Sequence, residues 1–311
     1  MATCLVTGGN GFLGSFVVDQ LVSKGHRVRV FDRFSGPQRY EAHGVERIAA
    51  DYRDELSMRA AVRGADHVYH FLATTNPVSS ERDPLTDLDN DVRPTVDLLR
   101  MCVEYDVQHF HFASTGGAIY GTTAHAAVDE NHPTRPVSPY GIGKLAIEGY
   151  VRYFSRLSSL RSTVFRISNP YGPRQSPFRQ QGVIPVFLRR ALAGEPLVVY
   201  GDGSSVRDYV FVEDAAAMIV TASQGNPESD VYNIGSGVGL SVTELINLIA
   251  EKIEHGVAVE YRDSRQTAVD RIVLDTGRFA EEFGSPDSRV PLNEGLERTI
   301  SHLHEWTELR A

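Results

Sequence analysis

The feature that most constrains the fold is a glycine-rich turn between a short apolar segment and an amphipathic segment near the N-terminus. Residues 3–14 read Thr-Cys-Leu-Val-Thr-Gly-Gly-Asn-Gly-Phe-Leu-Gly, so the glycines at 9, 11 and 14 match G-x-G-x-x-G between an expected strand and an expected helix. Such glycines allow a tight turn and bring the backbone close to a pyrophosphate at the positive end of the helix. We therefore predict cofactor contacts at Gly8, Gly11, Phe12, Leu13 and Gly14. The alternative is an ordinary glycine turn of an α/β protein.

A carboxylate follows the second expected strand, where the ribose of a dinucleotide is bound in proteins with such a turn. The apolar run at 27–31 ends in Asp32, which lies 18 residues beyond Gly14. A carboxylate there hydrogen-bonds ribose hydroxyls and repels a ribose phosphate, so Asp32 favours NAD over NADP. Its neighbour Arg33, also a predicted cofactor contact, carries the charge that a phosphate would require. The alternative interpretation of Asp32 is a solvated strand end.

Strand-like and helix-like segments alternate over residues 1–168. Expected strands lie near 45–50, 67–72, 107–113 and 161–167, and expected helices near 56–62, 85–105 and 140–152. This alternation predicts an α/β fold with a mostly parallel, doubly wound sheet. From residue 169 the regularity breaks and Pro and Gly become frequent. We predict that 169–311 form a smaller C-terminal α/β lobe that covers the sheet edge and binds substrate, with about 208–235 rejoining the first domain.

Residues at the carboxyl ends of the expected strands are further site candidates, because ligands of such sheets bind at that edge. Asp51 follows the third strand, where its side chain is placed to meet an adenine. Leu72, Ala73 and Thr74 mark the end of the fourth strand. The fifth ends in Ser114 and Thr115, whose hydroxyls either hydrogen-bond a substrate oxygen or simply cap the strand.

Tyr140 and Lys144 lie four residues apart in a segment that reads as a helix, so their side chains share one face. A fixed ammonium beside a phenol stabilises the phenolate and lowers the pKa of the phenol from about 10 toward neutrality. A tyrosine of this kind can take a proton from a hydroxyl and give it back. The spacing alone is weak evidence, since such pairs also occur on solvent-exposed helix faces.

The composition restricts the partners of the chain. Its 311 residues carry a net charge of −9, which argues against a broad basic surface for nucleic acid or an anionic membrane. Cys4 and Cys102 lie in apolar segments, and no Cys/His spacing resembles a zinc site, which favours a reducing compartment. There is no basic leader and no apolar stretch of about 20 residues. We therefore predict a cytoplasmic protein without a membrane partner.

Three strand histidines are interpreted as structural. His70 is predicted to be a core residue of the fourth strand. His109 and His111 alternate along the fifth strand, and we expect one to face each neighbouring layer. With no further ligands in reach, we predict no metal site.

Taken together, these segments resemble the extended short-chain dehydrogenase/reductase family, in particular its nucleotide-sugar epimerases of the UDP-glucose 4-epimerase type. The matching segments run in the family's order across nearly the whole chain: 7–14, Asp32, 51–54, 114–121, Tyr140 with Lys144, 166–175 and 201–210. No single segment is decisive, but their joint occurrence is specific.

The resemblance implies a Rossmann-type domain with tightly held NAD, a lobe for a nucleotide-diphosphate sugar, and a homodimer formed through helices of the first domain. It implies Tyr140 as the base, Lys144 on the nicotinamide ribose and on Tyr140, and Asn169 and Arg207 on the diphosphate. The matching segments also add Tyr52 to the cofactor contacts and Arg174 to the substrate contacts.

Further arginines are candidate diphosphate ligands because guanidinium groups match phosphate oxygens. Besides Arg207, we predict this role for Arg265 and Arg271, although a single arginine is more often a surface charge.

Departures from the family pattern indicate which of the family's reactions this chain is expected to catalyse. Dehydrating members carry Asp-Glu after the catalytic hydroxyl, whereas this chain has Gly116-Gly117, which disfavours dehydration. The usual hydroxyl position, counted back from Tyr120, falls on Gly116, so we predict Thr115 as the catalytic hydroxyl with Ser114 as second choice. Where the family commonly has Asn-Val-x-Gly-Thr, this chain has Asp91-Val-Arg-Pro-Thr, so no asparagine role transfers to Asp91.

The predicted function is therefore an NAD-dependent nucleotide-sugar 4-epimerase. Tyr140 removes the proton of a sugar 4-hydroxyl while hydride passes to NAD⁺, and hydride returns to the other face of the 4-keto sugar. The alternatives are a nucleotide-sugar reductase, dehydrogenase or dehydratase of the same family, and a non-catalytic NAD-sensing protein. The sequence leaves open the nucleotide, the sugar and whether its 2-position carries hydroxyl or acetamido.

Overall fold

The computed structural model describes residues 1–123, 125–178, 182–225, 227, 229–263, 269–285 and 289–308, with side chains described up to residue 304. Its largest sheet has seven strands in the order β10-β6-β5-β4-β1-β2-β3, and every neighbouring pair is parallel. These strands are β1 (Thr3–Thr7), β2 (Arg27–Asp32), β3 (Glu46–Ala49), β4 (His67–His70), β5 (His109–Thr115), β6 (Arg161–Ile167) and β10 (Val231–Ile234).

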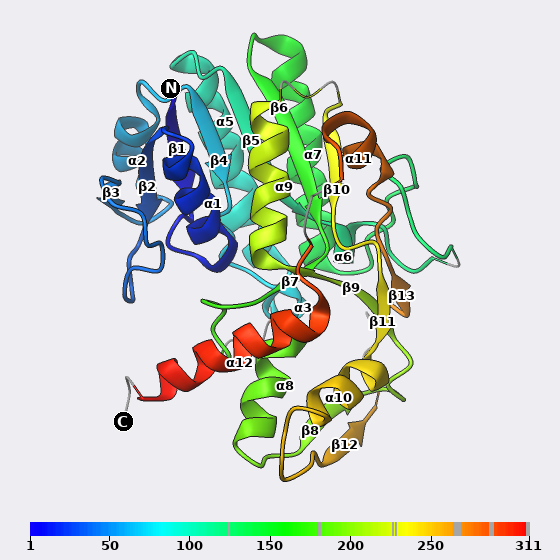
Figure 1. Ribbon diagram of the computed structural model, residues 1–311. Helices are drawn as coiled ribbons and strands as arrows, with labels where there is room; N and C mark the ends of the chain where they lie inside the picture. The colour runs from blue at the N-terminus through cyan, green and yellow to red at the C-terminus, as the bar shows by residue number, and fades with distance from the viewer. Residues whose placement is uncertain are drawn as a thin grey trace.

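Helices cover both faces of this sheet (Figure 1). One face packs against α1 (Phe12–Ser23), α9 (Val212–Gln224) and α11 (Gly277–Phe283), and the other against α2 (Glu55–Val62), α5 (Arg93–Glu104) and α7 (Pro139–Leu157). Strands that are buried on both faces read as nearly continuous apolar runs. In β1, for example, Cys4 and Val6 join one core and Leu5 joins the other.

The strand order reverses between β1 and β4. From β1 the chain winds outward through β2 to β3, then returns to β4 on the other side of β1 and winds outward again to β5 and β6. In doubly wound sheets a ligand crevice opens at this reversal, at the carboxyl ends of the strands. The α/β fold with a parallel, doubly wound sheet that the sequence predicts is confirmed.

A smaller lobe lies beyond the carboxyl edge of the sheet, at the bottom of Figure 1. Its own core includes Leu188, Val199 and Leu245. In it, β9 pairs with β7, β11 and β13, while β8 pairs with β12. Its elements are β7 (Asn169–Tyr171), α8 (Val183–Leu192), β8 (Leu197–Tyr200), β9 (Val206–Phe211), β11 (Gly239–Ser241), α10 (Val242–Ala250), β12 (Val259–Arg262), β13 (Arg271–Ile272) and α12 (Leu292–Glu308).

The chain passes between the two parts more than once. After β9, the helix α9 packs against α1 and β10 becomes the edge strand of the large sheet next to β6. The predicted division at residues 168 and 169, with a return of about 208–235 to the first domain, stays a prediction. Within the described residues, no helix is both long and apolar enough to cross a membrane.

Four short helical elements complete the fold on the carboxyl side of β4 and β5. They are α3 (Pro77–Arg82), α4 (Leu85–Asp87), the π-helical turn η1 (Leu88–Val92) and α6 (Gly116–Ile119). The expected single helix over 85–105 is thus interrupted by η1 before α5 begins at Arg93. Such π-helical turns are rare, and they occur frequently at functional sites.

Candidate functional site

A cleft of about 1240 Å³ lies at the carboxyl edge of the large sheet and is lined by both parts of the chain. It brings together most of the side chains that the sequence singles out. The predicted residues that line it are Gly8, Gly11, Phe12, Leu13, Gly14, Asp32, Arg33, Asp51, Tyr52, Leu72, Ala73, Thr74, Ser114, Thr115, Tyr140, Lys144, Asn169 and Arg207.

The glycine turn forms the floor of one end of the cleft. Gly8 has φ of 77°, a left-handed conformation that side chains disfavour. A Cβ added at Gly14 would lie 2.4 Å from the carbonyl oxygen of Gly8, and one added at Gly11 would lie 2.8 Å from the same atom. The turn is therefore too tight for side chains, and it leads into the N-terminus of α1, the kind of helix end that binds a pyrophosphate.

Asp32 lies beside this turn at the end of β2. Its carboxylate accepts hydrogen bonds from the backbone N–H groups of Asn10 at 3.2 Å and Phe34 at 3.3 Å, and the cleft is lined by both Asp32 and Arg33. These bonds hold the carboxylate in place while it faces the cleft. Together with the side-chain-free turn, the donor set fits a dinucleotide with a free adenosine ribose.

Asp51 and Tyr52 line the cleft in different ways. Asp51 forms an exposed ion pair with Arg53 at 3.1 Å. The hydroxyl of Tyr52 instead lies in the core, 3.2 Å from His70 Nε2 and 3.0 Å from Thr95 Oγ1. The phenol group of Tyr52 is therefore occupied within the protein and is not a free cofactor ligand.

Tyr140 and Lys144 are placed by the start of α7. The Ser138 hydroxyl accepts a hydrogen bond from the Gly141 N–H at 3.3 Å and Pro139 occupies the first turn, so Ser-Pro sets where the helix begins. Lys144 Nζ then lies 5.9 Å from the centre of the Tyr140 ring and donates to the carbonyl oxygen of Ala113 at 3.2 Å. The pair therefore meets the end of β5 in the cleft.

The electrostatics of this pair differ from the sequence-based expectation. Burial raises the pKa of Tyr140 above its usual value, and the carboxylates of Asp91 and Asp87 raise it further. Burial lowers the pKa of Lys144, while Asp91, Asp87 and Glu148 oppose that shift. For the protein alone the direction is thus opposite to the expected lowering of the phenol pKa by Lys144, because burial and the two carboxylates set it.

The structure separates the two candidate hydroxyls at the end of β5. Ser114 is buried, and its hydroxyl donates to Glu148 Oε1 at 2.6 Å. Thr115 is half-buried and lines the cleft, and a Cβ added at Gly117 would lie 4.0 Å from Thr115 Oγ1 and 3.7 Å from Asn169 Oδ1. Thr115 is therefore the hydroxyl that faces the open space.

A buried polar network supports this strand end from behind. Arg166 forms a two-point ion pair with Glu148 at 2.8 and 3.2 Å, and it also donates to the Tyr120 hydroxyl at 3.0 Å. Tyr120 in turn donates to Asn233 at 2.7 Å. The network joins α7, β6, the residue that follows α6, and β10.

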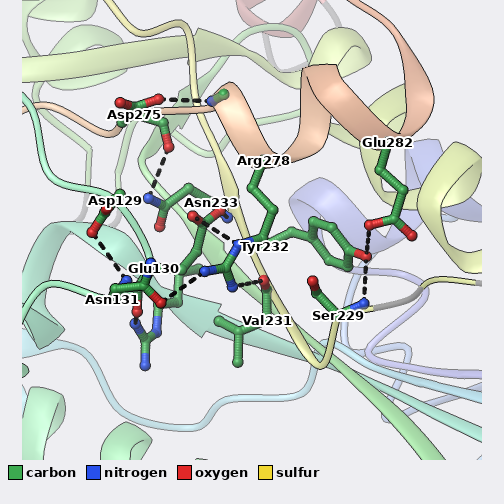
Figure 2. Close-up of polar contacts among 12 residues, drawn as sticks. Asp129, Glu130, Asn131, Ser229, Val231, Tyr232, Asn233, Asp275, Arg278 and Glu282 are labelled. Carbon is green, nitrogen blue, oxygen red and sulfur yellow. Dashed lines mark hydrogen bonds and ion pairs between the residues drawn. The ribbon is translucent and has the colours of Figure 1, made fainter.

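Figure 2 shows how the network continues through β10 to α11. Glu130 accepts from the Asn233 N–H at 2.7 Å and lies 3.4 Å from Arg278, which also donates to Val231 and Asn131. Sequence analysis missed this network because its members lie far apart in the chain.

The predicted substrate arginines do not share one environment. Arg207 on β9 lines the cleft, and burial lowers its pKa, opposed by Tyr209 and Asp270. Arg271 on β13 instead donates to the carbonyl oxygen of Ala126 and is not among the described lining residues. Arg265 lies outside the described residues.

The structure does not support the predicted substrate contact of Arg174. Arg174 is buried against the ring of Phe16 at 4.1 Å, and it pairs with Asp19 and Glu41 at 2.7 Å each. Because both carboxylates hold its guanidinium, it ties the segment after β7 to α1 and does not face the cleft.

The expectation that His109 and His111 face different layers is wrong. Side chains alternate between faces along a strand, so residues two apart share a face, and His109 and His111 stack at 4.1 Å on the same side of β5. His67 joins them, with its Nδ1 3.1 Å from His111 Nε2 and ring planes 9° apart. Their ligand atoms lie within 4.8 Å of one another, but a metal lies in the plane of each imidazole that binds it. Stacked rings of this kind are not oriented to share one ion.

His70 is a separate case. Its ring is buried in the core, and burial lowers its pKa to about 3.

Two carboxyl groups on elements that pack against α7 were not predicted. Asp87 ends α4 and Asp91 lies in η1, both buried, with the Thr75 hydroxyl between them. The departure at Asp91 from the family pattern was the available signal for this group.

Comparisons with known proteins agree with this geometry. The model of the NAD dependent epimerase/dehydratase family matches residues 4–235. The UDP-glucose 4-epimerase of Mycolicibacterium smegmatis is 33% identical over 311 residues, which cover 98% of this chain and 99% of that protein. A dTDP-glucose 4,6-dehydratase of Streptomyces griseus is 31% identical over 324 residues, covering 98% of this chain and 95% of that protein.

Solved structures show the same similarity. The UDP-glucose 4-epimerase of Thermotoga maritima, determined with UDP-glucose, has a TM-score of 0.90 and 35% identity and covers 98% of this chain and 99% of that chain. The UDP-glucose 4-epimerase of Thermus thermophilus, determined with NAD, has a TM-score of 0.90 and 33% identity and covers 97% of this chain and 99% of that chain.

Proposed function

The chain belongs to the NAD dependent epimerase/dehydratase family, and we propose that it is an NAD-dependent nucleotide-sugar 4-epimerase. Its substrates are UDP-glucose and UDP-galactose or the corresponding UDP-N-acetylhexosamines. The observation that carries the proposal is the convergence of Tyr140, Lys144 and Thr115 on the cleft that the glycine turn opens into. A non-catalytic NAD-binding protein has no use for that convergence.

The residues around Thr115 favour epimerisation over loss of water. Dehydration needs a second acid or base beside the reacting sugar carbon. Gly116 has no side chain, and a Cβ added there would lie 2.4 Å from Leu274 Cδ1 and 3.2 Å from the carbonyl oxygen of Arg166. Gly117, the other position, also lacks a side chain, which leaves Tyr140 as the acid and base beside Thr115.

The dinucleotide is held by the first part of the chain. The N–H groups at the start of α1 would hold its pyrophosphate, Asp32 its adenosine ribose, and Lys144 the ribose next to Tyr140. When bound, NAD⁺ would supply a group that can take up a hydride and give it back.

The chain's own groups carry the proton. Tyr140 takes the proton of the sugar 4-hydroxyl and later gives it back, while Thr115 hydrogen-bonds the same oxygen. Burial raises the pKa of Tyr140, and Lys144 is the cation that the chain places near its ring. A bound NAD⁺ would add positive charge beside this pair and would thereby favour the phenolate.

Asn169 and Arg207 are proposed to hold the diphosphate, so that the sugar can rotate while the nucleotide stays bound and can present either face to the cofactor. Arg207→Met should raise the KM for the nucleotide sugar about 10-fold or more, because a bound diphosphate loses a charge-assisted hydrogen bond. NAD content should not change. Steady-state kinetics with bound NAD measured in parallel checks this, and a lowered kcat at constant KM would contradict the assignment.

The proposed reaction has a direct test. Purified protein given UDP-glucose without added cofactor should produce UDP-galactose, followed through the anomeric proton signal, with no net formation of NADH. A panel including UDP-N-acetylglucosamine then identifies the sugar. Stoichiometric NADH formation would instead identify a dehydrogenase, and a 4-keto-6-deoxy product a dehydratase.

We further propose a homodimer in the cytoplasm. Exposed apolar side chains follow the helical period along α7, namely Ile142, Tyr150, Tyr153 and Leu157. Both cysteines are free thiols, which suits a reducing compartment. Sedimentation equilibrium and cell fractionation test these two points.

A further inference from the structure

Two buried carboxyl groups lie against the catalytic helix. Asp87 is 3% exposed and Asp91 is 5% exposed. Asp91 accepts hydrogen bonds from the Thr74 N–H and hydroxyl, both at 2.8 Å, and from the Thr75 N–H at 3.3 Å. These bonds fix Asp91 to the segment after β4, which lines the cleft at Thr74 and Thr75.

The Thr75 hydroxyl joins the two carboxyl groups. It lies 2.6 Å from Asp91 Oδ2 and also forms a short hydrogen bond with Asp87 Oδ1. A hydroxyl has one hydrogen to donate, so the Thr75 hydroxyl satisfies only one of the two carboxylates at a time. The other oxygen of Asp87 is buried and has no hydrogen-bond partner. The group therefore holds negative charge that its own hydrogen bonds do not fully balance.

The two carboxyl groups lie on elements that pack against the catalytic helix α7. A Cβ added at Gly143, between Tyr140 and Lys144 in α7, would lie 3.4 Å from Asp87 Cβ. Asp91 and Asp87 raise the pKa of both Tyr140 and Lys144.

The remaining groups around the catalytic pair do not replace this charge. Glu148 also raises the pKa of Lys144, but it is already paired with Arg166. The charge of Lys144 contributes to lowering the pKa of buried His70.

We propose that Asp87, Thr75 and Asp91 form a positioning site that keeps Lys144 an ammonium ion and Tyr140 a phenol until the cofactor binds. The role of Tyr140 in turnover rests on the proposed function, whereas the effect on Lys144 does not. The carboxylates oppose ionisation of Tyr140 in the empty cleft and stabilise the cation beside it. The site thereby links formation of the base to the arrival of positive charge on the cofactor.

Asp91→Asn is the informative substitution because it removes charge and keeps shape. The amide oxygen can still accept from Thr74, and the amide N–H can donate to the Thr75 hydroxyl, which then donates to Asp87. Without the charge of Asp91, Lys144 should lose its proton at a pH about one unit lower, the size expected for one nearby charge in a partly screened buried site.

The titration of Lys144 can be read directly. The sequence contains three lysines, Lys24, Lys144 and Lys252, so protein labelled with ¹³C and ¹⁵N only at lysine gives three side-chain signals. The Lys144 signal is assigned with Lys144→Arg. Following its chemical shift against pH in the full chain without substrate compares wild type with Asp91→Asn.

Asp89→Asn is the matched control, because Asp89 lies in the same turn with the same charge but is exposed. It should leave the Lys144 titration unchanged. If Asp91→Asn does not fold, Asp87→Asn takes its place with the same expectation. An unchanged Lys144 titration in a folded Asp91→Asn or Asp87→Asn variant overturns the proposal, as does an equal shift in the control.

The pH dependence of kcat/KM provides a second test, because it would not change if the carboxyl groups had only a structural role. In Asp91→Asn the pH at which kcat/KM rises should fall by about one unit, since removing a negative charge also lowers the pKa of Tyr140. A loss of activity that is equal at every pH would contradict this. If wild type converts no nucleotide sugar, the proposed function fails while the lysine titration still decides the carboxyl site.

Discussion

Replacing Tyr140 with phenylalanine is expected to reduce nucleotide-sugar epimerisation about 10³-fold while NAD remains bound. The substitution removes one hydroxyl from a cleft-lining side chain and leaves its ring in place. General acid–base groups contribute about 10²–10⁴-fold to such reactions. The glycine turn and Asp32 hold the dinucleotide without this hydroxyl, so cofactor content should not fall. Single-turnover and steady-state rates, with bound nucleotide quantified after denaturation, measure both quantities.

The matched control is Tyr150→Phe, which removes the same hydroxyl from an exposed position on the same helix. It should retain wild-type rates. Activity within a factor of ten of wild type in Tyr140→Phe would assign the proton transfer to another group. Loss of NAD from that variant would show a binding role in its place.

Arg166→Met should lower the free energy of unfolding by about 3–5 kcal/mol, the range found when one partner of a buried ion pair is removed. Arg166 and Glu148 have side-chain exposures of 5% and 1% and meet at 2.8 Å. Methionine fills part of the space but leaves Glu148 charged, with the Ser114 hydroxyl as its remaining described partner. Urea unfolding of the chain, followed by fluorescence or circular dichroism, measures the change.

An exposed ion pair provides the comparison. Arg262 and Glu260 meet at the same 2.8 Å distance, with exposures of 51% and 46%, so Arg262→Met should lower the free energy of unfolding far less than Arg166→Met does. The double variant Arg166→Met with Glu148→Leu should be more stable than Arg166→Met alone, because no unpaired charge remains. If the double variant is the less stable of the two, loss of packing and not an unpaired Glu148 explains the effect.

The parts of the site that follow from short stretches of sequence could be predicted. The glycine turn, Asp32 and the Tyr140–Lys144 pair each depend on residues close together in the chain. Their spacing within a strand, a turn or a helix sets which groups share a face. The alternation of strands and helices then brings those stretches to one edge of the sheet.

The sequence-based predictions failed where the partners of a side chain come from distant segments of the chain. Arg174 follows a segment expected to bind substrate, yet Asp19 and Glu41 hold it against α1. The expectation for His109 and His111 failed for a local reason, since residues two apart on a strand share a face. The raised pKa of Tyr140 depends on burial and on Asp91 and Asp87, none of which the Tyr-x-x-x-Lys spacing contains.

The sequence by itself determined the class of fold and the glycine turn and led to the proposal of the acid–base pair, because those depend on local geometry and on the order of elements. Only the tertiary structure showed that Ser114 is bonded to Glu148, which carboxylates hold Arg174 and which carboxyl groups lie on elements that pack against α7. Those outcomes depend on burial and on distances of a few ångströms between residues from different elements. Coulomb energies and desolvation change steeply over such distances.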